Sequence, residues 1–120
     1  MVNRGVDLKI TYANTRLEKY FNNYNLMQKK IPLEWVRKVK KIMQWLEAAD
    51  KFGDFLALGL GKPEQLKTNG EQILYSLHIS ANVRLIIGVN ATCDTVKICS
   101  EIEVEGVCDY HGNKENWYLS

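Results

Sequence analysis

Residues 71–90 read EQILYSLHISANVRLIIGVN, and apolar and polar side chains alternate along this stretch on both sides of a short polar break. The pattern predicts a β-hairpin whose turn is formed by residues 80–82. Side chains alternate with a period of two along a strand, so a three-residue loop places both apolar rows on one face. These two rows comprise Ile73, Tyr75, Leu77, Ile79, Val83, Leu85, Ile87 and Val89.

The opposite face of this hairpin is polar. His78 and Arg84 are expected to face each other across the two strands, and Gln72, Ser76 and Asn90 share their face. The hairpin therefore predicts a sheet with one buried face and one open face that carries a fixed arginine.

The composition predicts one domain, residues 1–120, with an ordinary core. Of the 120 residues 46% are hydrophobic and 25% are charged, values at which disorder is not expected. Three cysteines without paired spacing and only two histidines predict reduced thiols in the cytoplasm, no metal site and no cofactor. No stretch is long and apolar enough to predict a signal peptide or a membrane contact.

Charged residues are unevenly distributed, although the net charge is only +2. Residues 29–41 contain six basic side chains and one acidic one, and residues 94–109 contain five acidic side chains and one basic one. Such runs are usually solvated faces. In the first run Arg37, Lys38, Lys40 and Lys41 fall away from the apolar stripe of a predicted helix, which therefore has a core face and a basic face.

The predicted order of elements is strand, helix, helix and then three strands. A strand is expected at 6–12, a helix at 15–22 with a capping box formed by Thr15 and Glu18, and a second helix from Pro32 to about Lys51. Residues 22–25, 52–62 and 91–95 are predicted as turns or connections, the middle segment with at most one helical turn. A last strand begins near residue 96 and is interrupted by a bulge or bend at Gly106.

This order predicts an α+β fold in which two N-terminal helices pack on one face of a mainly antiparallel sheet. Residues 113–120 are interpreted as a C-terminal tail, and we expect Trp117, Tyr118 and Leu119 to dock on the core.

Five blocks of sequence together carry a family resemblance. They are LEKYF (17–21), VRKVKKIMQWLEAAD (36–50), LKTNG (66–70), NVRLIIG (82–88) and DYHG (109–112). In order and spacing they resemble the plasmid-maintenance killer proteins, the HigB-like branch of the RelE/ParE toxin superfamily, over about residues 8–112. The resemblance implies a RelE-like fold and a toxin of a type II toxin–antitoxin system.

The resemblance also implies an activity and partners. Many such toxins enter the ribosome and cut messenger RNA without a metal. Their antitoxin is usually a small helix-turn-helix protein, here expected to be HigA-like, and operator DNA is bound only through the toxin–antitoxin complex.

Site residues follow from the resemblance one position at a time. Arg84 matches the strand arginine that contacts the scissile phosphate, and Lys67 matches a lysine ahead of the hairpin. Asp109, Tyr110 and His111 match a C-terminal triplet in which the histidine is the leading acid–base candidate. Where some relatives carry a histidine three residues before the lysine, this chain has a glutamate, so no role is transferred to that position.

The residue types suit metal-free RNA cleavage, in which a 2′-hydroxyl attacks the neighbouring phosphorus. Arg84 is always charged and offers a planar fork to phosphate. His111 has an ordinary pKa near 6.5, so it can act as acid or base, Asp109 can orient it or act as a base, and Tyr110 can stack on a nucleobase or pack in the core. His78 is a candidate from the hairpin register alone, with a plain hydrogen-bonded role equally open.

The basic helix face gains a second interpretation in this context. Arg37, Lys38, Lys40 and Lys41 are candidates for docking on ribosomal RNA. Two other functions stay open: a ParE-like poison of DNA gyrase, and an attenuated antitoxin-binding co-repressor without nuclease activity, which the glutamate at position 64 favours.

Overall fold

The hairpin predicted at residues 71–90 forms as expected and supplies two neighbouring strands of the sheet. Strand β3 (Ile73–His78) pairs antiparallel with β4 (Val83–Val89), and His78 is the register partner of Arg84. The Ile79 amide donates a hydrogen bond of 2.9 Å to the Val83 carbonyl, which closes a three-residue loop. The predicted pairing, loop length and shared apolar face are therefore confirmed.

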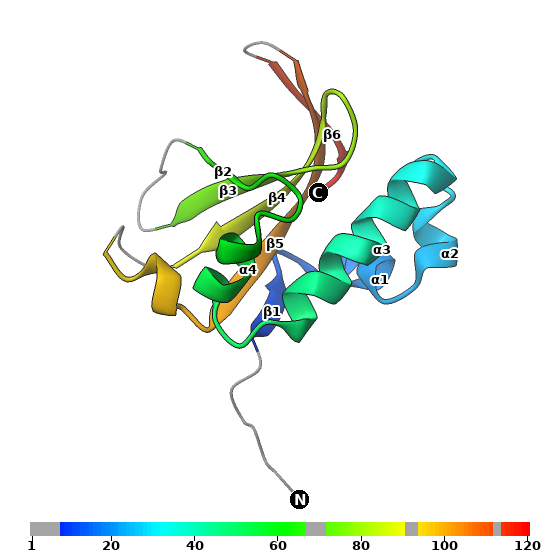
Figure 1. The fold of residues 1–120 in the computed structure, drawn as a ribbon. Coiled ribbons are helices and arrows are strands. Elements are labelled where there is room, and N and C mark those ends of the chain that lie inside the picture. Colours follow the sequence, from blue (N-terminus) through cyan, green and yellow to red (C-terminus); the bar gives the residue numbers. More distant parts are fainter. Residues whose placement is uncertain (1–7, 67–71, 91–93, 112–113) are drawn as a thin grey trace, which may run out of the picture.

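A computed structural model describes residues 8–66, 72–90, 94–111 and 114–120, without the side chains of residues 110, 111, 114 and 115. Over these residues the chain forms an α+β fold with four α-helices and one mixed six-stranded sheet. The strand order is β1-β5-β4-β3-β2, and β6 pairs with β5 on the same side as β1. Figure 1 shows α1, α2 and α3 grouped beside the sheet, with α4 in front of it.

Strand β5 (Glu101–His111) joins the two ends of the chain. Its first part pairs in parallel with β1 (Lys9–Tyr12), and its last part pairs antiparallel with β6 (Lys114–Leu119). The prediction of a C-terminal tail at 113–120 is thus wrong for residues 114–119, which form a strand. Docking is confirmed for Leu119, which is 3% exposed.

The N-terminal helices differ from their predictions at the caps. Helix α1 (Thr15–Phe21) is capped by Asn14, whose side chain accepts a 2.8 Å hydrogen bond from the Leu17 amide, so the predicted Thr15 capping box is wrong. The expected turn at 22–25 instead starts a short helix, α2 (Tyr24–Met27), which is capped by Asn23. Asparagine caps helices as well as threonine does, and the sequence offers both types side by side.

Two more helical segments follow. Helix α3 (Leu33–Ala48) begins one residue after the predicted start, with Pro32 as its N-cap, and ends before Lys51. The connection predicted at 52–62 contains a full helix, α4 (Phe52–Leu58), which ends at Gly59 in the left-handed conformation. A two-residue strand, β2 (Glu64–Gln65), then pairs with β3.

The structure of the segment after the hairpin also differs in part from the prediction. Residues Val96–Ile98 form a 3₁₀ turn rather than the start of a strand. The irregularity predicted at Gly106 is confirmed: Gly106 pairs with Ile86 but Val104 pairs with Ile87, so Glu105 is the extra residue of a bulge. Gly106 has a φ of 145°, which an L side chain rarely adopts.

Two faces of the sheet can now be defined. The helix-side face carries Leu77, Leu85, Ile87 and Val107, which are fully buried in one core with residues of α1, α3 and α4. The outer face carries the alternate positions of the same strands. Its centre is not open as predicted, because Ser76, Ile86 and Cys108 are 3%, 2% and 0% exposed.

No helix within the described ranges is long and apolar enough to cross a bilayer.

Candidate nucleic-acid interface

One row of residues crosses the outer face at the turn end of the hairpin. The register pairs His78 with Arg84, Arg84 with Cys108 and Cys108 with Trp117. Residues paired in this way have Cβ atoms roughly 5 Å apart on one face. The row therefore places an imidazole and a guanidinium side by side, with an indole two strands away.

Arg84 is held by the turn of its own hairpin. Its Nη1 donates to the carbonyls of Ser80 at 2.7 Å, Val83 at 3.1 Å and Ala81 at 3.2 Å. Among the described residues no hydrogen bond uses its Nη2 or Nε, and no carboxylate forms an ion pair with it. The turn thus fixes the guanidinium, and within the described part of the chain two of its nitrogens remain for an anion.

His78 lies in a positively charged environment. Burial lowers the pKa of His78 below its ordinary value of 6.5, and the positive charges of Arg84, Lys62 and Lys38 lower it further. Its imidazole makes no hydrogen bond with any described residue. At neutral pH the ring is therefore uncharged and able to accept a proton.

Lys62 is a residue that the sequence analysis missed. It is the one described non-glycine residue with positive φ, at 47°, and it follows Gly59 and Gly61, which are also left-handed. The His78 amide donates a 2.7 Å hydrogen bond to the Gly61 carbonyl, which fixes this loop beside β3. Continuing the antiparallel pairing of Glu64 with Ser76 by two more residues on each strand sets Lys62 opposite His78. The two glycines were the available signal, and they were interpreted only as a connection.

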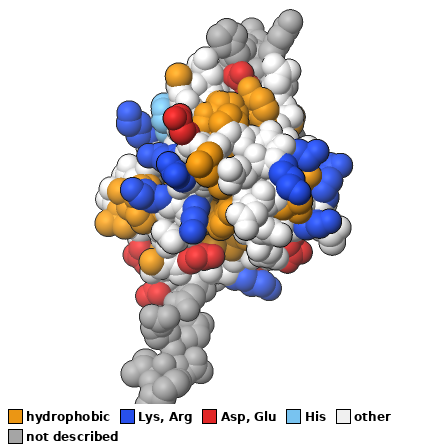
Figure 2. All heavy atoms as spheres, turned by 90° about the vertical axis from the view of Figure 1, so that its right-hand side faces the viewer, with side chains coloured by type: hydrophobic (Ala, Val, Ile, Leu, Met, Phe, Trp, Pro, Cys, Tyr) orange, Lys and Arg blue, Asp and Glu red, His pale blue; other side chains and the backbone are white. Residues whose placement is uncertain are grey.

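The basic face of α3 forms as predicted. Arg37, Lys40 and Lys41 are exposed and Lys38 is half-buried. The Lys40 ammonium lies 5.9 Å from the centre of the Tyr24 ring, within the range of a cation–π contact. Figure 2 looks onto the side of α2 and α3 and shows Lys and Arg side chains spread over this face, with apolar side chains between them.

Asp109 lies at the same end of the sheet as Arg84 but in the alternate row. Its register partner in β4 is Val83, a helix-side residue. Its Oδ2 accepts a 3.2 Å hydrogen bond from the Tyr118 hydroxyl, while its Oδ1 is buried without a hydrogen-bond partner in the described structure. The structure therefore brings Arg84 and Asp109 to neighbouring strand positions on opposite faces, and it leaves one carboxylate oxygen unused.

The remaining predicted site residues are only partly described. Tyr110 and His111 are the last two residues of β5, beyond the partner of Arg84, and their side chains lie outside the described part. Lys67 lies entirely outside it. Glu64, at the position where some relatives of the resembled family have histidine, is exposed on β2 beside Ser76, two pairs away from His78.

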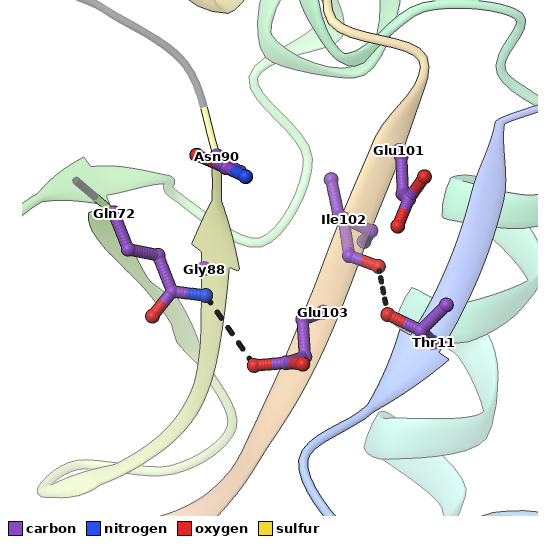
Figure 3. A pocket seen from close by; sticks show the side chains of 7 residues that line it. All are labelled: Thr11, Gln72, Gly88, Asn90, Glu101, Ile102 and Glu103. Atoms are coloured by element: carbon purple, nitrogen blue, oxygen red, sulfur yellow. Dashed lines mark hydrogen bonds between the residues drawn. The ribbon is translucent and has the colours of Figure 1, made fainter.

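The other end of the outer face is acidic. A cavity of about 330 Å³ is lined by Thr11, Gln72, Gly88, Asn90, Glu101, Ile102 and Glu103 (Figure 3). The Gln72 amide donates to Glu103 at 3.4 Å and to Glu105 at 3.3 Å. Burial, and then the hydrogen bond and charge of Glu103, raise the pKa of Glu105 to about 7. The two carboxyl groups thus share an amide and, near neutral pH, a proton.

The sequence analysis saw this acidic end only as a run of charge. Glu101, Glu103 and Glu105 alternate along β5 and so share one row, which ends at the bulge formed by Glu105. Within the described ranges, no group of three or more His, Cys, Asp or Glu side chains is arranged to hold a metal ion.

Comparisons with protein-family models, with curated proteins and with solved structures found no match for this chain. The candidate interface is therefore described by its own geometry: a fixed arginine, a neutral histidine and Lys62 at one end of a sheet, next to a basic helix that carries Lys38.

Proposed function

We propose that this chain has a RelE-like fold and is the toxin of a type II toxin–antitoxin system, a ribosome-dependent endoribonuclease that cuts messenger RNA without a metal. One observation carries the proposal. Lys62 and Arg84 place positive charge beside the neutral imidazole of His78, and no described carboxylate pairs with them. Like charges held together in a folded protein are unfavourable, so such a group is suited to an anion that completes it.

The order of elements along the chain agrees with the resemblance of its sequence blocks. A strand and helices precede an antiparallel hairpin, and the arginine lies on β4, which is paired on both sides. The basic face of α3 supplies a second surface for phosphate, which suits a target as large as ribosomal RNA.

The proposed reaction needs three parts. His78 or His111 takes the proton from the 2′-hydroxyl, whose oxygen attacks the adjacent phosphorus. The bond from phosphorus to the 5′-oxygen breaks, and the leaving oxygen takes a proton from the other histidine, so that a 2′,3′-cyclic phosphate and a 5′-hydroxyl result. The free nitrogens of Arg84 bind the phosphoryl oxygens, where a planar fork is effective.

The histidine roles follow from charge. A base must be neutral before it reacts, and His78 is kept neutral by burial and by its cationic neighbours. This leaves His111, the acid–base candidate from the family resemblance, as the acid. Asp109, with one unused carboxylate oxygen, is available to orient an imidazole.

The test is expression of the chain alone, with growth and the 5′ ends of cellular messages recorded. We expect growth arrest with cuts inside translated messages. Arg84→Ala and His111→Ala are each expected to relieve the arrest without loss of the fold. Lys19→Ala, which removes an exposed charge on α1, is the control and is expected to stay toxic.

Other outcomes would select another function. If both variants stay fully toxic, the site is assigned wrongly. A DNA-damage response with intact messages would indicate a gyrase poison. Absence of any growth defect would indicate an antitoxin-binding co-repressor.

A further inference from the structure

Two neighbouring aromatic residues of β6 are equally exposed but differently placed. Trp117 is 42% exposed and Tyr118 is 40% exposed. The Tyr118 ring packs edge-on against Trp35 of α3, with 5.1 Å between ring centres, and its hydroxyl bonds to Asp109. Tyr118 is therefore a helix-side contact that joins β6 to α3.

Trp117 has no such partner among the described aromatic rings. It is the register partner of Cys108, so it stands on the outer face in the same row as His78 and Arg84. A Cβ at Gly106 would lie 3.0 Å from the six-membered part of the Trp117 ring, so the glycine leaves room for the indole to rest against β5. The indole is thus supported against β5 and partly exposed to solvent.

The distance along the row suits a nucleotide. Strands in a sheet are about 4.8 Å apart, so two intervals place Trp117 about 10 Å from Arg84. The cations at one end of the row attract phosphate. An exposed, supported indole can stack on any base, because every base has a π-face. A single strand laid along the row would meet phosphate-binding groups first and an aromatic platform next.

We propose that Trp117 is a stacking platform for a nucleobase of single-stranded RNA whose phosphate lies at Arg84, His78 and Lys62. This rests on the proposed function, since it assigns a substrate subsite to the same interface. Charge favours this occupant over a protein partner, because the row is cationic and Glu64 on β2 is two pairs away from it.

The experiment measures binding separately from cleavage. A labelled RNA oligonucleotide with 2′-O-methyl groups cannot be cut, because the attacking hydroxyl is blocked. Its affinity for the purified chain is compared with that of an abasic strand of equal length. Trp117→Ala is expected to weaken binding of the RNA by roughly 5- to 150-fold, the range for loss of one stacked base, and to leave binding of the abasic strand unchanged. Trp117→Phe should retain most of the affinity.

Tyr118→Ala is the matched control, because it removes an aromatic ring of equal exposure that faces the helices. We expect it to lower the melting temperature and to leave RNA affinity unchanged. Equal RNA affinity for the wild type and Trp117→Ala would overturn the proposal, as would failure of the wild type to bind the oligonucleotide. A smaller sedimentation coefficient of Trp117→Ala with unchanged RNA affinity would also overturn it, by assigning the ring to contact between copies. Binding that depends on Trp117, without any cleavage of unmodified messenger RNA on ribosomes, would contradict the nuclease function alone.

Discussion

The two ends of the outer face have the same scaffold and opposite chemistry. Both are built on β4 and β5, at the pair of Gly88 with Glu103 and at the pair of Arg84 with Cys108. At the acidic end, the charge is neutralised from within by an amide and a shared proton. At the basic end, the cations have no described carboxylate partner, and the imidazole between them responds by losing its proton.

This difference separates a structural cluster from a binding site. A group of like charges whose repulsion is offset by its own hydrogen bonds and protonation is stable without a ligand. A group without such partners is unfavourable until a counterion binds. The bulge at Glu105 and Gly106 lies between the two ends. Each prediction below alters one end and leaves the other as its reference.

The largest effect is expected at His78. His78→Asn should lower the rate of RNA cleavage by about 10²–10⁴-fold, the usual contribution of a proton-transfer group. Glu103→Gln, at the acidic end, should leave the rate unchanged. Because the wild-type base must be deprotonated and its pKa lies below 6.5, protonation of His78 should lower wild-type activity at acid pH, and this acid limb should be absent in His78→Asn. Equal pH profiles for the wild type and His78→Asn would show that His78 takes no part in proton transfer.

The boundary between the ends is expected to be sensitive to a single methyl group. At Gly106 an added Cβ would overlap the Leu119 carbonyl, and φ is 145°. Gly106→Ala should therefore lower the free energy of unfolding by about 2–4 kcal/mol, measured by denaturant titration. Gly59→Ala also has positive φ, but nothing lies within 4 Å of its Cβ, so we expect a loss of only about 1 kcal/mol. Similar losses at both sites would mean that the packing at the bulge is loose.

At the acidic end, the pKa of Glu105 determines the sign of the pH dependence of the free energy of unfolding. The pKa of Glu105 rises from 4.5 to about 7 on folding, so its protonated form stabilises the fold at low pH and this contribution is lost as the pH rises through 7. Glu105→Gln keeps the neutral shape. It should raise the free energy of unfolding at pH 8 by about 1 kcal/mol, after discounting for solvent screening, and have little effect at pH 4. A gain that is independent of pH would show that the carboxyl groups do not share a proton.

The smallest effect is expected on the basic helix face. Arg37→Ala or Lys41→Ala should each weaken RNA binding a few-fold and reduce the slope of log affinity against log salt by about 0.7, the value for one phosphate contact to a single strand. Glu101→Gln, which removes a charge at the acidic end, should leave the slope unchanged. An unchanged slope in both helix variants would show that this face is an ordinary solvated surface that does not bind phosphate.

Much of the fold was predictable where neighbours in the sequence determine it. The hairpin register followed from a period of two and an odd loop, and it placed His78 opposite Arg84 correctly. The parallel pairing of β1 with β5 joins residues about ninety positions apart, and no local pattern encodes it. Helix α4 was missed because Gly53 indicates a break, yet this glycine lets the helix approach the backbone at Lys97 closely.

The candidate site was predictable in its arginine and histidine but not in its surroundings. Lys62 acquires its place from a left-handed loop, and Trp117 acquires its face from the pairing of β6; both depend on long-range geometry. Asp109 was predicted to belong to the same site as Arg84, but strand alternation puts it on the other face.

The most direct test is an NMR titration of the His78 ring, identified by the loss of its signal in His78→Asn. In the free protein we predict a pKa below 6.5, and we predict that it rises when the 2′-O-methyl RNA oligonucleotide is added, because bound phosphate neutralises the surrounding cations. A pKa at or above 6.5 in the free protein, unmoved by RNA, would contradict the claim that the basic end of the sheet is an uncompensated anion site.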